Sequence, residues 1–349
     1  MHRLPSPNLM TVEGHILEQQ HLHPSASGDF TSVLNDIAFA TKIISREVAR
    51  AGLVNILGTT GETNVQGETV QKLDDFANSA MMRCVGRRGQ VCMMASEELA
   101  DAEMVDPGEG SGKYIVVFDP LDGSSNIDAN VSIGTIFAIY RRRMSLASVD
   151  ESDVLQPGRD LVAAGYVIYG SSTMFVYTTG HGVHGFTLDP GIGEYLLSHE
   201  NITTPFSAKI YSVNEGNEPQ WSDTVIDVVR QLKHGRDGAA KDQPDGRPMT
   251  SRYVGSLVSD FHRNLLYGGV FLYPATERRA NGKLRLLYEA APMAMIAENA
   301  GGYASDGSRA ILDIVPEDLH QRVPLYIGSR GTVLWIEEKL SGHKVGSGV

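Results

Sequence analysis

The sequence predicts an α/β fold made of two packed subdomains. Its 349 residues exceed what one compact core usually holds, which favours two subdomains. Stretches with apolar residues at helical spacing and short β-rich runs both occur, as expected of an α/β chain. The composition, with 42% hydrophobic and 21% charged residues, is ordinary for a globular protein and shows little of the bias that marks disorder.

The first half opens with a long amphipathic helix, expected over residues 30–53. Its apolar residues recur at helical spacing; they are Val33, Leu34, Ile37, Ala38, Ile44 and Val48. The Gly-rich stretch 57–68 predicts a long, mobile loop of the kind that often carries function. A second helix is expected over 69–84, followed by strands over 91–95, 113–118, 133–140, 162–170, 174–179 and 182–188. The first half should therefore contain a sheet flanked by helices.

The polar stretch 198–209 is interpreted as the joint between the two halves, with the boundary placed between residues 205 and 206. In the second half, strands are predicted over 209–213, 270–274, 284–289 and 325–329, and helices over 256–269, 332–340 and within 291–302. Residues 1–10 form an expected loose tail, and the stretch 233–248 is expected to be a disordered loop.

Charge and cysteine content exclude several classes of protein. A formal net charge of -12 with scattered basic residues argues against a nucleic-acid binder, because phosphate contacts need clustered Lys and Arg. The two cysteines, Cys84 and Cys92, show no disulfide framework, which suits a reducing compartment. The sequence has no secretory h-region and no apolar run of about 18 residues that could span a bilayer. We therefore expect a cytoplasmic protein without a nucleic-acid or membrane partner.

Acidic residues gather where predicted strands end. Glu97 and Glu98 follow one strand, Asp119 and Asp122 close the next, and Glu289 ends a third. Carboxylates at strand ends can converge on one point, and a hard cation would relieve their repulsion. Oxygen donors without nearby His or Cys favour Mg²⁺, with Mn²⁺ as a substitute. Taken singly, the Glu97–Glu98 pair is also typical of a solvated surface, and DPLDG of an ordinary turn.

Small residues follow these acids directly. Gly123, Ser124, Ser125 and Asn126 stand at a predicted helix start, where free backbone N–H groups can hold a phosphate. The alternative is that Ser124 or Ser125 merely caps the helix. If the first interpretation holds, the cation site and an anion site are adjacent.

Longer motifs resemble class I fructose-1,6-bisphosphatases of the bacterial type. The similarity is carried by FDPLDGSSNIDANVSIGTIFAIYRR, LQPGRDLVAAGYVIYGSSTM, YSVNEGN, RYVGSLVSDFHRNLLYGGVFLYPA, NGKLRLLYE and LDIVPEDLHQR. The resemblance implies a layered α-β-α-β-α sandwich of the sugar phosphatase superfamily, which includes inositol monophosphatase-like enzymes, and a homotetramer. It also implies an N-terminal allosteric subdomain, 1–205, that carries most metal ligands, and a C-terminal substrate-binding subdomain, 206–349.

The resemblance assigns roles to individual positions. The metal ligands it implies are Glu97, Glu98, Asp119, Asp122, Glu289 and the Leu121 carbonyl. Asp74, working with Glu98, would deprotonate the attacking water, and Glu68 in the mobile loop would pair with Arg285 on closure. The substrate-binding residues it implies are Asp122, Gly123, Ser124, Ser125, Asn214, Arg252, Tyr253, Tyr273 and Lys283, with Arg252 reaching the 6-phosphate from a neighbouring subunit. Without the resemblance, Tyr273 reads as core and Lys283 as a solvated strand edge.

An allosteric AMP site is also implied, at the start of the first long helix. Its positions are Ser27, Gly28, Asp29, Phe30, Thr31, Lys113, Tyr114 and Arg141. A helix start suits a phosphate, although an N-cap by Ser27 or Asp29 explains the local sequence equally well. AMP is therefore an expected inhibitor.

The implied reaction is metal-assisted hydrolysis of the 1-phosphate of fructose 1,6-bisphosphate, a step of gluconeogenesis. Three features depart from mammalian members: Glu68 replaces Asp, Asn217 replaces Tyr, and the motif YECNP becomes YEAAP. The shorter Asn217 leaves its role as a phosphate contact open. Alternatives are a dual fructose-1,6-/sedoheptulose-1,7-bisphosphatase, an inositol-monophosphatase-like enzyme and a non-enzymatic nucleotide sensor, the last disfavoured because every matched carboxylate position is filled.

Overall fold

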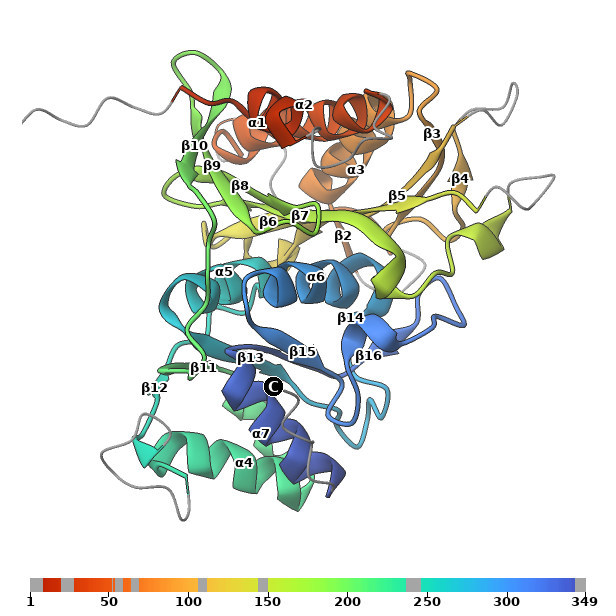
Figure 1. The fold of residues 1–349 in the computed structure, drawn as a ribbon. Helices are drawn as coiled ribbons and strands as arrows, with labels where there is room; N and C mark the ends of the chain where they lie inside the picture. Colours follow the sequence, from red (N-terminus) through yellow and green to blue (C-terminus); the bar gives the residue numbers. More distant parts are fainter. Residues whose placement is uncertain are drawn as a thin grey trace, which may run out of the picture.

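Helices and sheets alternate in five layers in the computed structural model, which describes residues 9–19, 28–51, 53, 59–63, 69–105, 112–143, 150–236 and 246–342. Figure 1 shows α1–α3 above an eight-stranded sheet, α5 and α6 between this sheet and a five-stranded sheet, and α4 and α7 below the second sheet. The predicted α-β-α-β-α sandwich is confirmed. The helices are α1 Val12–Gln19, α2 Asp29–Val48, α3 Lys72–Val85, α4 Asp223–His234, α5 Leu257–Tyr267, α6 Ala291–Asn299 and α7 Arg330–Ser341.

The eight-stranded sheet has the order β10-β9-β8-β7-β6-β5-β3-β4. Only β3 and β5 pair in parallel, and the remaining neighbours are antiparallel. Both β3 and β5 are buried along their whole length, because helices cover both faces of the sheet. The strands are β3 Val91–Ser96, β4 Glu103–Met104, β5 Tyr114–Asp122, β6 Ile133–Arg141, β7 Leu161–Tyr169, β8 Thr173–Thr178, β9 His184–Asp189 and β10 Glu194–His199.

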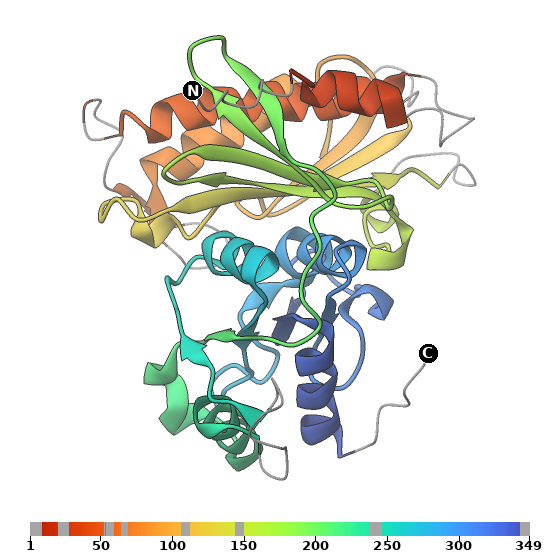
Figure 2. The same ribbon diagram turned by 60° about the vertical axis from the view of Figure 1, so that its left-hand side comes forward.

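The five-stranded sheet has the order β12-β11-β13-β17-β15. Figure 2 shows the single connection from β10 that passes beside the middle helices to reach this sheet. Two small ladders, β1–β2 and β14–β16, complete the sheets of the described part of the chain. The strands are β1 Thr59–Thr63, β2 Thr69–Gln71, β11 Ile210–Ser212, β12 Thr250–Ser251, β13 Gly269–Tyr273, β14 Leu284–Arg285, β15 Tyr303–Ser305, β16 Arg322–Val323 and β17 Leu325–Gly328.

Three apolar cores hold the layers together. One lies between α1–α3 and the eight-stranded sheet, one joins the eight-stranded sheet to α5, α6 and the second sheet, and one lies between the second sheet and the helices α4 and α7. The middle core contains most of α6, whose residues Ala291 to Ala297 are all buried. None of the helices in the described part of the chain is long and apolar enough to cross a bilayer.

Several sequence predictions are wrong in detail. The strand predicted over 284–289 ends after Arg285, and a π-helix, Leu286–Ala290, leads into α6 instead. A buried apolar run fits a strand or a helix equally well, and only packing between the sheets decides. The predicted 57–68 loop includes β1, and β2 takes the start of the helix expected from residue 69. The elements α1, β10 and α4 were not predicted, and α4 includes Lys233 from the predicted disordered stretch.

Candidate active site

Three carboxylates from separate elements meet near the C-terminal ends of β3 and β5. Oxygens of Glu97, Asp119 and Glu289 lie within 4.8 Å of one another, and all three residues are buried. The cluster contains no His or Cys, so its donors are oxygens alone. Such a donor set suits a hard divalent cation.

The fold brings these carboxylates together through neighbouring parallel strands. Glu97 follows β3 and its N–H donates to the Phe118 carbonyl of β5 at 3.1 Å, which places it beside Asp119. Glu289 comes from the π-helix and accepts a bond from the Arg285 N–H at 2.5 Å. Glu97 also accepts from the Arg285 guanidinium, with Nη1 and Oε1 2.5 Å apart.

Burial and mutual repulsion dominate the electrostatics of the cluster. Burial raises the pKa of Asp119 well above its usual range, and the neighbouring Glu97 and Glu289 raise it further. Burial, with the nearby Glu97 charge, raises the pKa of Glu289 to about 8. Like charges held this close are costly unless a proton or a cation compensates them. The residues present therefore fit a bound divalent cation.

Asp122 lies in the same cavity but outside this three-carboxylate cluster. Its carboxylate accepts bonds from the Ser256 hydroxyl at 2.6 Å, the Val258 N–H at 2.8 Å and the Leu257 N–H at 3.2 Å. These N–H groups belong to the first turn of α5, where a negative charge is favourable. Burial raises the pKa of Asp122, and these hydrogen bonds oppose the rise. Asp122 thus ties the end of β5 to the middle helix layer.

One cavity of about 350 Å³ contains most of the predicted site residues. From the metal set it is lined by Glu97, Glu98, Asp119, Leu121, Asp122 and Glu289, and from the other sets by Gly123, Ser124, Ser125, Tyr253, Tyr273, Lys283 and Arg285. Acids from the first half of the chain therefore face aromatic and basic residues from the second. Gly255, Leu257, Phe271 and Leu284 also line it and were not predicted, although Gly255 lies within RYVGS and Phe271 within FLYP.

Three predicted residues do not line this cavity. Asp74 is buried in the first turn of α3. Asn214 caps the 3-10 helix Glu215–Gln220, accepting from the Gly216 N–H at 3.1 Å. Arg252 is exposed, and its guanidinium donates to the Ser251 carbonyl at 2.8 Å. Glu68 lies outside the described residues.

The predicted anion site follows Asp122 as one turn of 3-10 helix, Ser124–Asn126. Its N-cap is Gly123, whose φ of 80° is in the left-handed region, and no side chain caps the turn. The alternative of a capping Ser124 or Ser125 is therefore wrong. A Cβ on Gly123 would lie 2.7 Å from the Ser256 Cβ, so this position needs glycine for space as well as for backbone conformation.

The residues expected to bind AMP also lie together, where α2 begins. Gly28 is the N-cap, so the alternative N-cap by Asp29 is wrong; Ser27 lies outside the described residues. The Asp29 carboxylate pairs with the Lys113 ammonium at 2.6 Å. Around this pair the ring of Phe30 lies 5.9 Å from that of Tyr114, over which the Arg141 guanidinium sits at 5.8 Å. Thr31 is buried in the first turn of α2.

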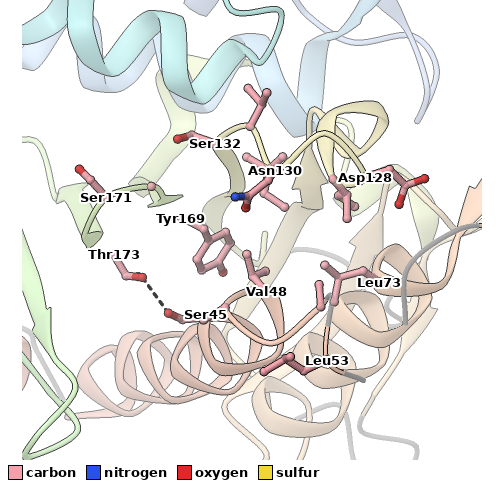
Figure 3. Close-up of a pocket in the computed structure, with 16 residues that line it drawn as sticks. Ser45, Val48, Leu53, Leu73, Asp128, Asn130, Ser132, Tyr169, Ser171 and Thr173 are labelled. Atoms are coloured by element: carbon pink, nitrogen blue, oxygen red, sulfur yellow. Dashed lines mark hydrogen bonds between the residues drawn. The ribbon is translucent and has the colours of Figure 1, made fainter. Parts of the chain in front are cut away.

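A second and larger cavity, of about 620 Å³, opens between the C-terminal part of α2 and the ends of β6 and β7. Figure 3 shows Val48, Leu53, Leu73 and Tyr169 among the side chains that line it. The Ser45 and Thr173 hydroxyls, 2.7 Å apart, close one wall. Unlike the acidic cavity, this second cavity has no cluster of carboxylates among the described residues that line it.

Comparison with known proteins finds matches along nearly the full length of the chain. Two family models match it: the fructose-1-6-bisphosphatase N-terminal domain over residues 10–200 and the C-terminal domain over residues 204–341. A fructose-1,6-bisphosphatase class 1 of Chlorobium phaeobacteroides (strain BS1) is 57% identical over 337 residues, covering 96% of this chain and 99% of the relative. Another from Maridesulfovibrio salexigens is 57% identical over 328 residues, covering 93% and 95%.

Solved structures agree with the sequence comparisons. The holo form of Leishmania major fructose-1,6-bisphosphatase superimposes with a TM-score of 0.88 at 41% identity, covering 96% of this chain and 99% of that chain. Its T-state structure gives a TM-score of 0.84 at 40% identity, covering 97% and 100%. The likeness therefore extends over all five layers rather than one subdomain.

Proposed function

This chain belongs to the fructose-1,6-bisphosphatase family, and on that premise we propose that it hydrolyses D-fructose 1,6-bisphosphate to fructose 6-phosphate and inorganic phosphate, the gluconeogenic reaction. The observation that carries the proposal is the cavity in which Glu97, Asp119 and Glu289 face Tyr253, Tyr273 and Lys283. One end suits a cation and the phosphate that reacts, and the other supplies donors for a second phosphate.

The resident cation is proposed to be Mg²⁺, with Mn²⁺ as a substitute. Glu97, Asp119 and Glu289 would hold it, with Glu98, Asp122 and the Leu121 carbonyl completing the ligands. When bound, such a cation lowers the pKa of a coordinated water and neutralises charge on phosphate oxygens. The raised pKa values of Asp119 and Glu289 support the assignment, because a cation would compensate the charges that burial penalises.

The proton of the attacking water is proposed to pass to Glu98, with Asp74 assisting. Glu98 lies half-buried at the cavity wall, where a carboxylate can accept a proton. Glu68 is proposed to pair with Arg285 when its segment closes over the site. In the described structure Arg285 holds Glu97, so closure would share or exchange this guanidinium between two carboxylates.

The 6-phosphate is proposed to lie against Tyr253, Tyr273 and Lys283. Burial raises the pKa of Tyr253 to about 12, so its hydroxyl stays protonated and can donate to a phosphate. Asn214 and Arg252 would complete this end, with Arg252 supplied by a neighbouring subunit of a homotetramer. Its position outside the lining of its own chain's cavity supports this assignment.

Subunit mixing tests the role of Arg252. Hybrids of Arg252→Ala and Asp119→Asn chains, each inactive alone, should recover activity if one chain supplies Arg252 to the other's cavity. Mixed oligomers of verified composition that stay inactive would show that Arg252 does not act across an interface.

AMP is proposed as an inhibitor that binds where α2 begins, with Gly28, Asp29, Phe30, Thr31, Lys113, Tyr114 and Arg141 around it. The convergence of charged and aromatic side chains on this helix start supports the proposal. We further propose a cytoplasmic enzyme, divided functionally at residue 205 into an allosteric and a substrate-binding subdomain.

Phosphate release from a substrate panel tests the catalytic proposal. The purified protein should release phosphate from fructose 1,6-bisphosphate with Mg²⁺ and lose this activity in excess chelator. Sedoheptulose 1,7-bisphosphate and inositol 1-phosphate complete the panel, although the relatives' names do not favour either alternative. Equal hydrolysis of fructose 1,6-bisphosphate with and without chelator would overturn the metal-dependent mechanism, and no hydrolysis at all would overturn the substrate.

A further inference from the structure

The acidic end of β5 contains a β-bulge. Asp119 pairs with Ile136 and Asp122 pairs with Gly134 of β6, so Pro120 and Leu121 together face Thr135. Two residues against one is the definition of a bulge, and it bends the strand locally. Pro120 has no N–H to give to the ladder, which is why regular pairing cannot continue here.

A side-chain hydroxyl from β6 binds the backbone of the bulge. The Thr135 hydroxyl, fully buried, donates to the Pro120 carbonyl at 2.7 Å. The same Thr135 oxygen lies 2.8 Å from the Tyr169 hydroxyl. A threonine hydroxyl has one proton and a carbonyl can only accept, so the Tyr169 hydroxyl must be the donor to Thr135. Burial raises the pKa of Tyr169 well above its usual range, so it keeps the proton that it donates.

We propose that Thr135 and Tyr169 are positioning residues for the hydrolytic reaction: their hydroxyl relay holds the Pro120 carbonyl and thereby fixes the bulge that presents Asp119, Leu121 and Asp122. The inference rests on the proposed function for its catalytic meaning. The segment from Asp119 to Asp122 carries two carboxylates and the carbonyl of Leu121 within four residues, so a small rotation of its backbone would displace all of them. Thr135 and Tyr169 do not line the acidic cavity and act through Pro120.

Tyr169 also forms part of the wall of the second cavity, where Figure 3 shows its ring among the lining residues. The relay therefore runs from that cavity through β7 and β6 to the acidic end of β5. Tyr169 is 5% exposed, so its hydroxyl is shielded, and little competition from water is expected. A shielded hydrogen-bonded relay is well suited to hold a backbone segment in one position.

The plainer interpretation is that the relay only satisfies buried polar groups. The same molecule offers a matched control for this view. The Tyr195 hydroxyl lies 3.2 Å from the Thr41 hydroxyl, which donates to the Ala38 carbonyl at 3.0 Å. This second relay has the same chemistry and is equally buried, but it joins β10 to α2 and touches no residue of the acidic cavity. If burial alone mattered, breaking either relay would have the same consequences.

The experiment compares Thr135→Val with Thr41→Val, and Tyr169→Phe with Tyr195→Phe. Thr135→Val keeps the side-chain shape but leaves the Pro120 carbonyl without its donor. We expect its kcat to fall by about tenfold to a hundredfold with KM for fructose 1,6-bisphosphate unchanged. Thr135→Ser, which keeps the hydroxyl, should restore kcat. Tyr169→Phe should have a smaller effect in the same direction, and neither control should change kcat.

Two readouts do not depend on activity. In metal-free protein, amide exchange of the peptide that contains residues 119–122 should accelerate in Thr135→Val, because the Leu121 N–H bonds within this bulge to Asp119 at 3.0 Å. Binding of Mn²⁺ alone, followed by electron paramagnetic resonance, should weaken in the same variant. Both should be unchanged in Thr41→Val.

Unchanged exchange at residues 119–122 together with unchanged Mn²⁺ binding in Thr135→Val would overturn the positioning role. Equal kcat losses in the Thr135 and Thr41 variants would do the same. If Thr135→Val does not fold, Tyr169→Phe decides: normal exchange, Mn²⁺ binding and kcat in this variant would reject the inference. Failure of wild-type protein to hydrolyse fructose 1,6-bisphosphate would instead reject the proposed function. The exchange and Mn²⁺ measurements would still test whether Thr135 and Tyr169 hold the bulge in place.

Discussion

The acidic cavity and the start of α2 both collect charged groups from distant parts of the chain, but they are balanced differently. In the cavity, Glu97, Asp119 and Glu289 carry the same sign and are buried. At the start of α2, Asp29 and Lys113 carry opposite signs, with side chains 31% and 47% exposed. Arg285 pairs with Glu97, but the described cluster still holds more carboxylates than this one guanidinium balances, so a cation would complete the balance. A phosphate bound at the second site would instead compete with Asp29 for Lys113. Four experiments test this contrast.

Asp119→Asn should have the largest effect. Removing one buried negative charge from the cation site should lower kcat on the order of 10³-fold. The metal-free variant should also unfold at a higher temperature than wild type, because a carboxylate that its neighbours repel has been replaced by a neutral group. Asp119 is a better choice than Asp122, whose three accepted hydrogen bonds an amide could not all keep, so Asp122→Asn should also destabilise the fold.

The matched control for Asp119→Asn is Asp128→Asn, since Asp128 is an exposed carboxylate at the second cavity. Its kcat and melting temperature should be close to wild type. Full activity in Asp119→Asn would separate this carboxylate from the reaction. A melting temperature below wild type in the metal-free variant would contradict the repulsion argued for the cluster.

The pH dependence of stability tests the cluster without any substitution. The pKa of Glu289 rises from 4.5 to about 8 in the folded protein, so folding favours its protonated form. This contribution is complete at low pH and is lost as pH rises from about 5 to 8, by on the order of a few kcal/mol. Metal-free protein should therefore melt at lower temperature at pH 8 than at pH 6, and Mg²⁺ should remove most of this difference. A chelated protein whose stability does not fall over this range would argue against uncompensated carboxylates.

Lys113→Ala tests the second site. Loss of one cationic hydrogen-bond donor to phosphate should raise the AMP concentration for half-inhibition by about tenfold or more. Stability should change by less than about 1 kcal/mol, because the ion pair is exposed. Lys42→Ala is a suitable control, since Lys42, which lies on α2 as Asp29 does, forms a similar surface pair with Glu194 of β10.

The AMP concentration for half-inhibition of wild type should also rise with Mg²⁺ concentration if metal and AMP favour opposite states. Unaltered inhibition in Lys113→Ala would remove this lysine from the site.

The smallest expected effect is that of Asp29→Asn, which tests directly whether Asp29 competes with a phosphate for Lys113. Asp29→Asn should lower the AMP concentration for half-inhibition by about two- to fivefold, because an exposed ion pair is worth about 0.2–1 kcal/mol and Lys113 would no longer be engaged by it. Turnover without AMP should not change. Weaker inhibition in this variant would mean that Asp29 contacts the nucleotide favourably rather than competing with it.

How much of the site the sequence could predict depended on how far apart along the chain the interacting residues lie. Glu97 and Asp119 were identified because strand ends are local features, and the neighbouring parallel strands then bring them together. The π-helix under Glu289 was not predicted, since its apolar run fits a strand equally well. The bonds from the start of α5 to Asp122 join residues 134 positions or more apart, and no local pattern encodes such a contact. The same holds for the Asp29–Lys113 pair.

The π-helix that carries Glu289 makes the site sensitive to chain length as well as to residue type. It occupies Leu286–Ala290 and continues without a break into α6. Its winding therefore sets the direction in which side chains point between strand β14 and that helix. Each residue of an α-helix advances the chain by about 100° around the axis. Deleting one residue from this turn would convert the π-helix to an ordinary α-helix. Glu289 would then rotate about the helix axis relative to α6 and point away from Asp119, although no other side chain had been changed. The number of residues in this turn therefore sets the direction of Glu289 as strongly as their identity does. A design that repacks α6 has to keep this number before it changes any side chain of the proposed cation site.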